Sequence, residues 1–134
     1  MKHSESPEQT EAAGAALAGR LAPGDVVLVS GELGSGKTTF VRGACRALGV
    51  EGPVTSPTFT IGQVYGGRLE VAHLDLYRLV SLAGEDPALL EDYLRPDRIG
   101  FVEWPDAAGP AIDRVAARVR LEHAGGDRRR IEVT

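Results

Sequence analysis

The chain has 134 residues, the size of one ordinary domain, so we expect a single domain over residues 1–134. Its net charge of −4 argues against a general nucleic-acid-binding surface, and its one cysteine excludes an internal disulfide and a cysteine-based zinc site. No apolar run approaches the roughly 20 residues of a membrane helix, and residues 1–5 do not open a signal peptide. We therefore expect a cytoplasmic protein that does not contact membranes.

The first third of the chain predicts a helix, a strand, a glycine-rich loop and a second helix. Residues 6–9 (Ser-Pro-Glu-Gln) are typical of a helix start, and residues 23–24 (Pro-Gly) are expected to end that helix. Residues 26–29 are four consecutive apolar residues, as in a strand buried on both faces. Apolar residues then recur with helical spacing over residues 38–48, and Gly49 is a suitable residue to end that helix.

The rest of the chain predicts an α/β domain with a mixed sheet. Runs typical of strands cover residues 58–65, 68–75, 99–102, 118–122 and 130–133. A Gly-Gly pair joins the first two runs as a hairpin, and Gly-Gly-Asp joins the last two as a second hairpin. A short helix is expected to begin at residues 86–87 (Asp-Pro).

The segment from Gly31 to Thr38, GELGSGKT, fits the phosphate-binding pattern G-x-x-x-x-G-K-[ST]. Glycines let the backbone turn its N–H groups toward a polyphosphate, and the helix that follows adds its positive dipole end. The Lys37 ammonium can reach the outer phosphates, and the Thr38 hydroxyl can ligate Mg²⁺. The alternative is a glycine-rich turn with an incidental Lys-Thr pair. The pattern predicts a nucleoside triphosphate and Mg²⁺ as ligands, with nucleotide contacts from Leu33, Gly34, Ser35, Gly36, Lys37, Thr38 and Thr39.

Two carboxylates follow apolar strands and are candidates for the metal site. Asp75 ends the run 71–75, and Glu103 follows the run 99–102. In open α/β sheets, ligands lie where such strands end. Spacing does not decide which carboxylate touches metal and which orients water. His73 is expected to be a packed or hydrogen-bonded strand residue rather than a ligand.

Four segments together resemble a known family. They are GELGSGKTTF at residues 31–40, SPTF at 56–59, HLDLYR at 73–78 and VEWP at 102–105. In their order and spacing, over nearly the whole chain, they resemble the bacterial TsaE family. These are small P-loop ATPases that support threonylcarbamoyladenosine modification of tRNA at position 37.

The resemblance implies a three-layer P-loop NTPase-like domain with a mixed, mainly parallel sheet and antiparallel hairpins. It implies TsaB and TsaD as protein partners, contact with tRNA only through that complex, and a monomer when isolated. ATP hydrolysis, with Lys37 among the catalytic residues, would cycle the complex without transferring the threonylcarbamoyl group. The stretch at residues 88–91 lacks a glycine that the family pattern leads us to expect, which bears on partner contacts there.

Motif matching assigns roles to particular residues. Thr38 would be a Mg²⁺ ligand, and Asp75 and Glu103 would be the metal or hydrolysis carboxylates. Residues 55–59 would form a loop ordered by the γ-phosphate and Mg²⁺. Two more residues would lie near the nucleotide, Thr10 and Asp106.

Other functions remain open on the sequence alone. A small-molecule kinase could use the same loop, with Arg95 and Arg98 as a phosphoryl clamp. A nucleotide-gated interaction module would differ from the ATPase mainly in rate. A GTPase is disfavoured because the chain has no asparagine for an Asn-Lys-x-Asp motif. Trp104 could lie at the nucleotide, at a partner or half-buried. Residues 128–130 (Arg-Arg-Arg) could contact phosphate or an RNA partner, or simply begin a solvated strand.

Overall fold

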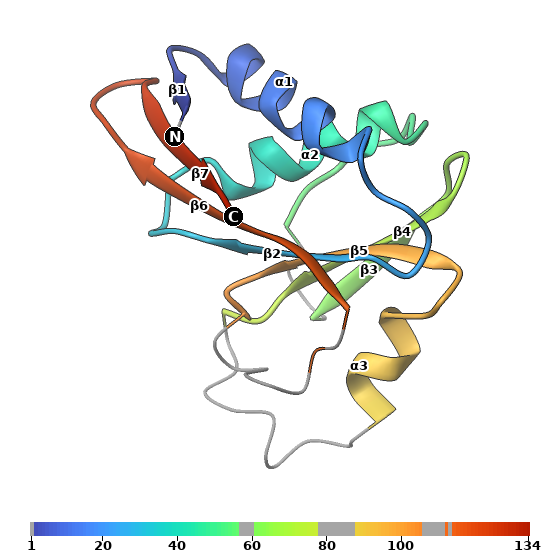
Figure 1. Cartoon of the computed structure of the whole chain (residues 1–134). Helices are drawn as coiled ribbons and strands as arrows, with labels where there is room; N and C mark the ends of the chain where they lie inside the picture. Colours follow the sequence, from blue (N-terminus) through green and yellow to red (C-terminus); the bar gives the residue numbers. More distant parts are fainter. Residues whose placement is uncertain (1, 57–60, 78–87, 106–111, 113) are drawn as a thin grey trace.

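A twisted mixed sheet carries α1 and α2 on one face and α3 on the other (Figure 1). The structure is a computed structural model, and it describes every residue except 1, 57–60, 78–87, 106–111 and 113. In the described part the strands form one seven-stranded sheet in the order β1-β7-β6-β2-β5-β4-β3. The elements are β1 (Lys2–Ser4), α1 (Pro7–Ala18), β2 (Val26–Ser30), α2 (Lys37–Ala47), β3 (Gly62–Tyr65), β4 (Glu70–Asp75), α3 (Ala88–Tyr93), β5 (Arg98–Glu103), β6 (Val115–His123) and β7 (Arg129–Val133).

Parallel strands form the centre of the sheet and antiparallel strands form both sides. β6, β2, β5 and β4 run parallel, whereas β3 pairs antiparallel with β4, and β7 pairs antiparallel with β6 and β1. Both predicted hairpins are therefore present, and the expectation of an α/β fold with a mixed sheet is confirmed. The strand at residues 26–29 is buried on both faces, as its unbroken apolar sequence predicts.

Two elements differ from the sequence-based expectation. Helix α1 begins as predicted, with Pro7 at its start and the Ser6 side chain accepting from the Gln9 N–H. It ends at Ala18 rather than at residues 23–24, because the bonds there tighten to i→i+3, with Leu21 N–H donating to the Ala18 carbonyl at 3.2 Å. The three-residue strand β1 was not predicted, since its residues are too few to show an alternating pattern.

Helices α1 and α2 touch backbone to backbone. A Cβ at Gly14 of α1 would overlap the Phe40 carbonyl oxygen, and a Cβ at Gly43 of α2 would overlap the main chain of Glu11. The two helices in close contact pack over the main core, which includes Val27, Phe40 and Ala44. A second apolar cluster lies on the α3 side of the sheet. None of the helices in the described ranges is long and apolar enough to cross a bilayer.

The parallel strands end at one edge of the sheet, called here the carboxyl edge. β2, β5 and β4 are adjacent, with Val29 opposite Glu103 and Glu103 opposite Asp75. The glycine loop leaves β2 at the same edge. The fold therefore brings the loop and both predicted carboxylates together.

Candidate phosphate-binding site

The loop between β2 and α2 turns its backbone in a way that glycine allows. Gly34 and Gly36 have positive φ angles of 78° and 98°. Gly36 is the N-cap of α2 and supplies no side chain to satisfy the first N–H groups of the helix. These N–H groups, together with the positive end of the helix dipole, are features that favour an anion at the carboxyl edge.

Lys37 is folded back over this loop. Its side chain is buried, and its ammonium donates to the carbonyls of Gly31 at 2.7 Å and Glu32 at 2.8 Å. Burial lowers the pKa of Lys37, whereas the nearby Glu103 and Asp75 act in the opposite direction. The lysine is therefore held in place on weak neutral acceptors, where an incoming anion would be a better partner.

Thr38, the next residue, is joined to a carboxylate from another strand. Its Oγ1 lies 3.1 and 3.3 Å from the two carboxylate oxygens of Glu103 and 2.6 Å from Ser56 Oγ. Glu103 is buried at the end of β5. A hydroxyl and a buried carboxylate at this distance are the oxygen donors that Mg²⁺ prefers.

Asp75 lies one strand further from the loop. Its Oδ1 accepts the Tyr77 N–H at 3.0 Å. Burial raises the pKa of Asp75, and the Glu103 charge adds to that rise, while the Tyr77 N–H opposes it. A carboxylate whose charge is disfavoured by burial and by a neighbouring carboxylate favours a cation beside it.

The residues present fit a magnesium ion that shares its coordination with phosphate. In the described part of the chain no group of three or more His, Cys, Asp and Glu side chains could hold a metal alone. Mg²⁺ at phosphate-transfer sites characteristically uses one or two carboxylates, with the remaining positions filled by substrate oxygens and water. Thr38 and Glu103 supply that partial set.

A hollow of about 310 Å³ unites most of the predicted site residues. Its lining comprises Leu33, Gly34, Gly36, Lys37, Thr38, Thr39, Ser56, Asp75, Glu103, Trp104 and Arg129. Of the remaining predicted residues, Ser35 belongs to the loop and is fully buried. Thr10 lies behind the loop, where its methyl group is 3.7 Å from a Cβ position on Gly36 and its hydroxyl is 2.7 Å from that of Ser4. Asp106 and residues 57–59 lie outside the described residues.

Arg129 is a lining residue from the run 128–130, for which the sequence left phosphate contact, an RNA partner and a solvated strand start as alternatives. It begins β7 opposite His123, the last residue of β6, and β6 runs parallel to β2. The second hairpin therefore returns Arg129 to the loop, where its Nε is 3.6 Å from a Cβ position on Gly36. Strand order and hairpin direction, which the sequence does not fix, are what bring Arg129 to the hollow.

The arginines considered for a kinase clamp lie elsewhere. Arg98 begins β5 and pairs at 3.0 Å with Glu70, which begins β4. Arg95 precedes that strand and lies 3.7 Å from Asp97. Both arginines are thus at the edge of the sheet opposite the glycine loop, and neither can clamp a phosphoryl group there.

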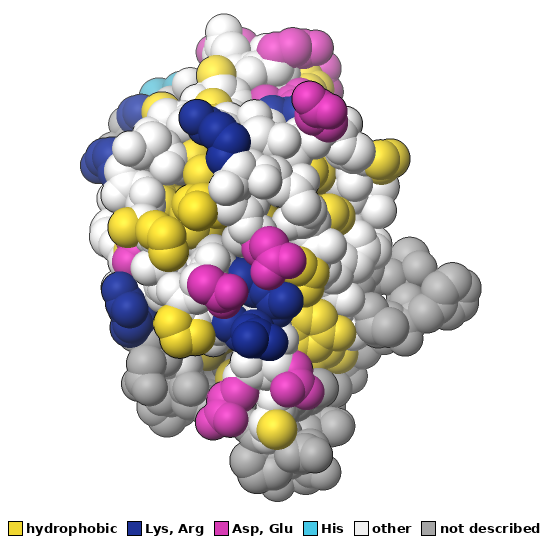
Figure 2. All heavy atoms as spheres, turned by 90° about the vertical axis from the view of Figure 1, so that its right-hand side faces the viewer, with side chains coloured by type: hydrophobic (Ala, Val, Ile, Leu, Met, Phe, Trp, Pro, Cys, Tyr) yellow, Lys and Arg dark blue, Asp and Glu magenta, His cyan; other side chains and the backbone are white. Residues whose placement is uncertain are grey.

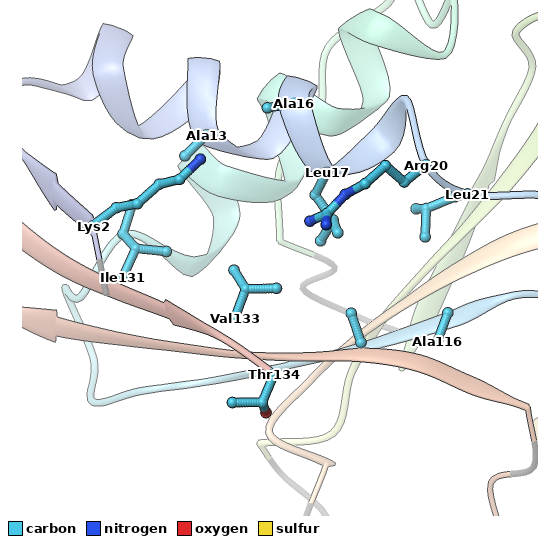
Figure 3. A pocket seen from close by; sticks show the side chains of 11 residues that line it. Lys2, Ala13, Ala16, Leu17, Arg20, Leu21, Ala116, Ile131, Val133 and Thr134 are labelled. Carbon is cyan, nitrogen blue, oxygen red and sulfur yellow. The ribbon is translucent and has the colours of Figure 1, made fainter.

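A larger hollow, of about 580 Å³, lies away from the loop (Figure 3). It opens between α1 and the strands β6 and β7, with Leu17 and Ile131 among its lining residues and Lys2 and Arg20 beside them. Among the residues that the structure describes, its lining includes no part of the glycine loop and no carboxylate side chain. On the face shown in Figure 2, basic and acidic side chains of the described residues are intermixed, which does not favour nucleic-acid binding by that part of the surface.

Comparisons with known proteins agree with the geometry. The model of the family described as "Threonylcarbamoyl adenosine biosynthesis protein TsaE" matches residues 4–131. A tRNA threonylcarbamoyladenosine biosynthesis protein TsaE from Bacillus subtilis is 36% identical over 96% of this chain and 81% of its own length. Those of Streptomyces coelicolor and Treponema pallidum are 41% identical over 85% of this chain and 79% of their own length, and 32% identical over 97% and 96%, respectively. The crystal structure of Bacillus subtilis YdiB superposes with a TM-score of 0.76 at 31% identity, covering 97% of this chain and 80% of that one.

Proposed function

Because this chain belongs to the TsaE family, whose members act in tRNA threonylcarbamoyladenosine biosynthesis, we propose that it binds ATP with Mg²⁺ and hydrolyses it slowly. The observation that carries the proposal is the meeting of Thr38 and Glu103 at the mouth of the glycine loop. Glu103, at the end of β5, is thus placed against the hydroxyl of Thr38, the residue after the loop lysine. A glycine-rich turn with only a structural role would not require a carboxylate at that position.

The phosphates would lie against the N–H groups of the loop and of the first turn of α2. Lys37 would exchange the carbonyls of Gly31 and Glu32 for phosphate oxygens, which are charged acceptors and so bind an ammonium more strongly. Arg129, beside Gly36, would add positive charge on the far side of the loop from Glu103. Leu33, which is 68% exposed, would leave the outer end of the site open to a partner.

Thr38 and Glu103 would hold Mg²⁺, and Asp75 would orient water near it. Glu103 is assigned to the metal because its oxygens are within hydrogen-bond distance of Thr38, whereas Asp75 is one strand further away. Mg²⁺ supplies charge neutralisation for the β- and γ-phosphate oxygens. The protein's own part is to fix the oxygens of Thr38 and Glu103 in place and to keep Asp75 available as an acceptor for a water proton.

We further propose that hydrolysis cycles a complex of TsaB and TsaD in the cytoplasm, with tRNA contacted only through that complex. Release of phosphate should be slow for the isolated chain and faster with both partners, since the one arginine in the described lining of the hollow, Arg129, approaches the loop at Gly36, and the sequence has no obvious arginine finger. Phosphate release measured with and without TsaB and TsaD tests this. An isolated chain that turns over at kinase-like rates, about 1–100 s⁻¹, would contradict it.

The same assay separates hydrolysis from a kinase activity. With γ-labelled ATP, the label should appear in inorganic phosphate and not in a metabolite added from a cell extract. Transfer of label to a small molecule would show that the chain is a kinase despite the placement of Arg95 and Arg98.

A further inference from the structure

His73 is a fully buried titratable side chain that the proposed function does not use. It lies on β4, and its Nε2 is 2.5 Å from Glu103 Oε2. Its other ring nitrogen, Nδ1, is 3.2 Å from the Tyr65 hydroxyl on β3. Tyr65 in turn donates to the Thr55 carbonyl at 3.2 Å. Both imidazole nitrogens are thus committed, one to a site carboxylate and the other to a tyrosine that binds the loop backbone.

The number of hydrogens fixes the direction of these contacts. A carboxylate oxygen such as Glu103 Oε2 can only accept, so the ring hydrogen lies on Nε2 and points toward it. In the neutral ring Nδ1 is then an acceptor, and the single hydroxyl hydrogen of Tyr65 serves the contacts with Nδ1 and with the Thr55 carbonyl. These contacts set the orientation of the ring and present Nε2–H to Glu103.

Glu103 is in turn fixed between two partners. Its Oε2 contacts His73 on one side and Thr38 on the other, and Oε1 also faces Thr38. Thr38 contacts Ser56, which follows Thr55 in the chain. The contacts thus form a closed ring from the glycine loop through Glu103, His73 and Tyr65 to residues 55–56 and back to Thr38. This set of residues is called here the His73 ring.

We propose that His73 is a positioning residue that holds the Glu103 carboxylate toward Thr38, and that Tyr65 holds the imidazole and ties residues 55–56 to the same unit. The inference rests on the proposed function, because it assigns Glu103 to the metal. It adds a chain of contacts through which ligand binding at Glu103 and Thr38 would change the order of residues 55–56. Groups that orient a metal ligand in this way generally change metal affinity by about 10- to 100-fold when they are replaced.

Two amide substitutions distinguish the contact made by Nε2 of His73 from the contact made by Nδ1. The amide nitrogen of glutamine reaches about as far as Nε2, whereas that of asparagine reaches only about as far as Nδ1. His73→Gln therefore keeps a donor to Glu103, and His73→Asn loses it. Both variants are neutral and polar, so a general effect on the core would affect them alike.

Titration calorimetry measures the dissociation constant of AMP-PNP, once with Mg²⁺ and once with EDTA. His73→Asn should weaken the Mg²⁺-dependent affinity about 10-fold or more, while His73→Gln stays within about 3-fold of the unsubstituted protein. Affinity in EDTA should be unchanged in both. Equal loss in the two variants, loss that is the same with and without Mg²⁺, or no loss in either would overturn the proposal.

A second experiment does not depend on metal or on the folding of the His73 variants. Tyr65→Phe removes the hydroxyl alone, and hydrogen exchange of a peptide spanning residues 54–56 is measured without nucleotide. Exchange should become faster than in Tyr93→Phe, a control at a tyrosine packed in the α3-side cluster. Unchanged exchange would show that the His73 ring does not hold this segment. If the unsubstituted protein binds AMP-PNP equally well with Mg²⁺ and with EDTA, the proposed function is contradicted, whatever the exchange result.

Discussion

The ammonium of Lys37 lies 4.3 Å from the centre of the Trp104 ring while it donates to two loop carbonyls. Trp104 is the single tryptophan of the chain and has a positive φ of 55°, a conformation that favours glycine. Its ring is also 4.8 Å from that of Tyr77. The indole is thus held against the loop lysine by a backbone that is strained locally, and any movement of the ammonium changes its surroundings.

Replacement of Lys37 by alanine should abolish tight ATP binding, lowering affinity by about 100-fold or more, because a charged contact to the phosphates is lost. The indole fluorescence should change when ATP is added to the unsubstituted protein and should stay constant in Lys37→Ala. The matched control is Lys2→Ala, which removes the other lysine of the chain and should bind normally. An unchanged dissociation constant for Lys37→Ala would show that the hollow is not the ATP site.

Glu103→Gln should reduce phosphate release by about 100-fold or more while the protein remains folded. Glutamine keeps the size of the side chain and can still hydrogen bond to His73 and Thr38, but it removes the charge that balances Mg²⁺. Glu70→Gln is the control, since Glu70 pairs with Arg98 at the opposite edge of the sheet. Equal rates for Glu103→Gln and Glu70→Gln would remove Glu103 from the mechanism.

Asp75 should make the nucleotide-free protein less stable as pH rises. Its pKa in the fold is raised above the unfolded value, chiefly by burial, so the folded state holds the proton more tightly. Stability is therefore lost as pH increases from 3.8 through the raised folded pKa, and the deficit persists at neutral pH. Asp75→Asn should consequently be the more stable protein at pH 7, by less than about 1 kcal/mol since solvent screens this half-buried group, and the difference should vanish near pH 3.

Denaturant unfolding at several pH values measures this difference. Adding ATP and Mg²⁺ at pH 7 should reverse the order, because only the ionised carboxylate of Asp75 accepts a proton from water or attracts the cation. A variant that is less stable than the parent at pH 7 without ligand would show that the Asp75 charge is favourable in the fold.

The sequence predicted the elements that have a strong local pattern. The unbroken apolar run at residues 26–29, the helical spacing after Lys37 and the two glycine-joined hairpins are all present, because each pattern is favoured by its immediate neighbours. The α/β fold class could be predicted from their succession, and so could the presence of two carboxylates at one edge.

The contacts that complete the site depend on strand order, which has no local signal. Arg129 reaches the glycine loop only because β7 folds back beside β6, and β6 lies next to β2. His73 reads in sequence as an ordinary strand residue, and it is indeed hydrogen-bonded within the sheet. Its partner, Glu103, is 30 residues away and becomes its neighbour only when β4 and β5 pair.

Cys45 should be inert toward thiol reagents in the folded protein. It is fully buried on α2, and burial raises the pKa of its thiol to about 12. The reactive thiolate is therefore scarce at pH 8, where an exposed thiol is substantially ionised. Iodoacetamide should label the chain at this position only after denaturation, as followed by mass spectrometry, and rapid labelling of the native protein would show that α2 opens.

Gly14→Ala should destabilise the protein although alanine is favoured over glycine in a helix by about 1 kcal/mol. The added methyl group would overlap the Phe40 carbonyl, and because this is main chain of α2, the helices themselves must separate. We expect a net loss of about 1–3 kcal/mol, or a fall in Tm of roughly 4–12 °C, and a similar loss for Gly43→Ala.

Gly52→Ala is the control, because a Cβ there meets nothing within 4 Å, and it should change the unfolding free energy by less than about 0.5 kcal/mol. A stabilising effect of Gly14→Ala in thermal unfolding would show that α1 and α2 do not approach this closely. Since α2 carries Lys37 and Thr38, loss of the contact should also weaken ATP binding in proportion to the disturbance of the loop.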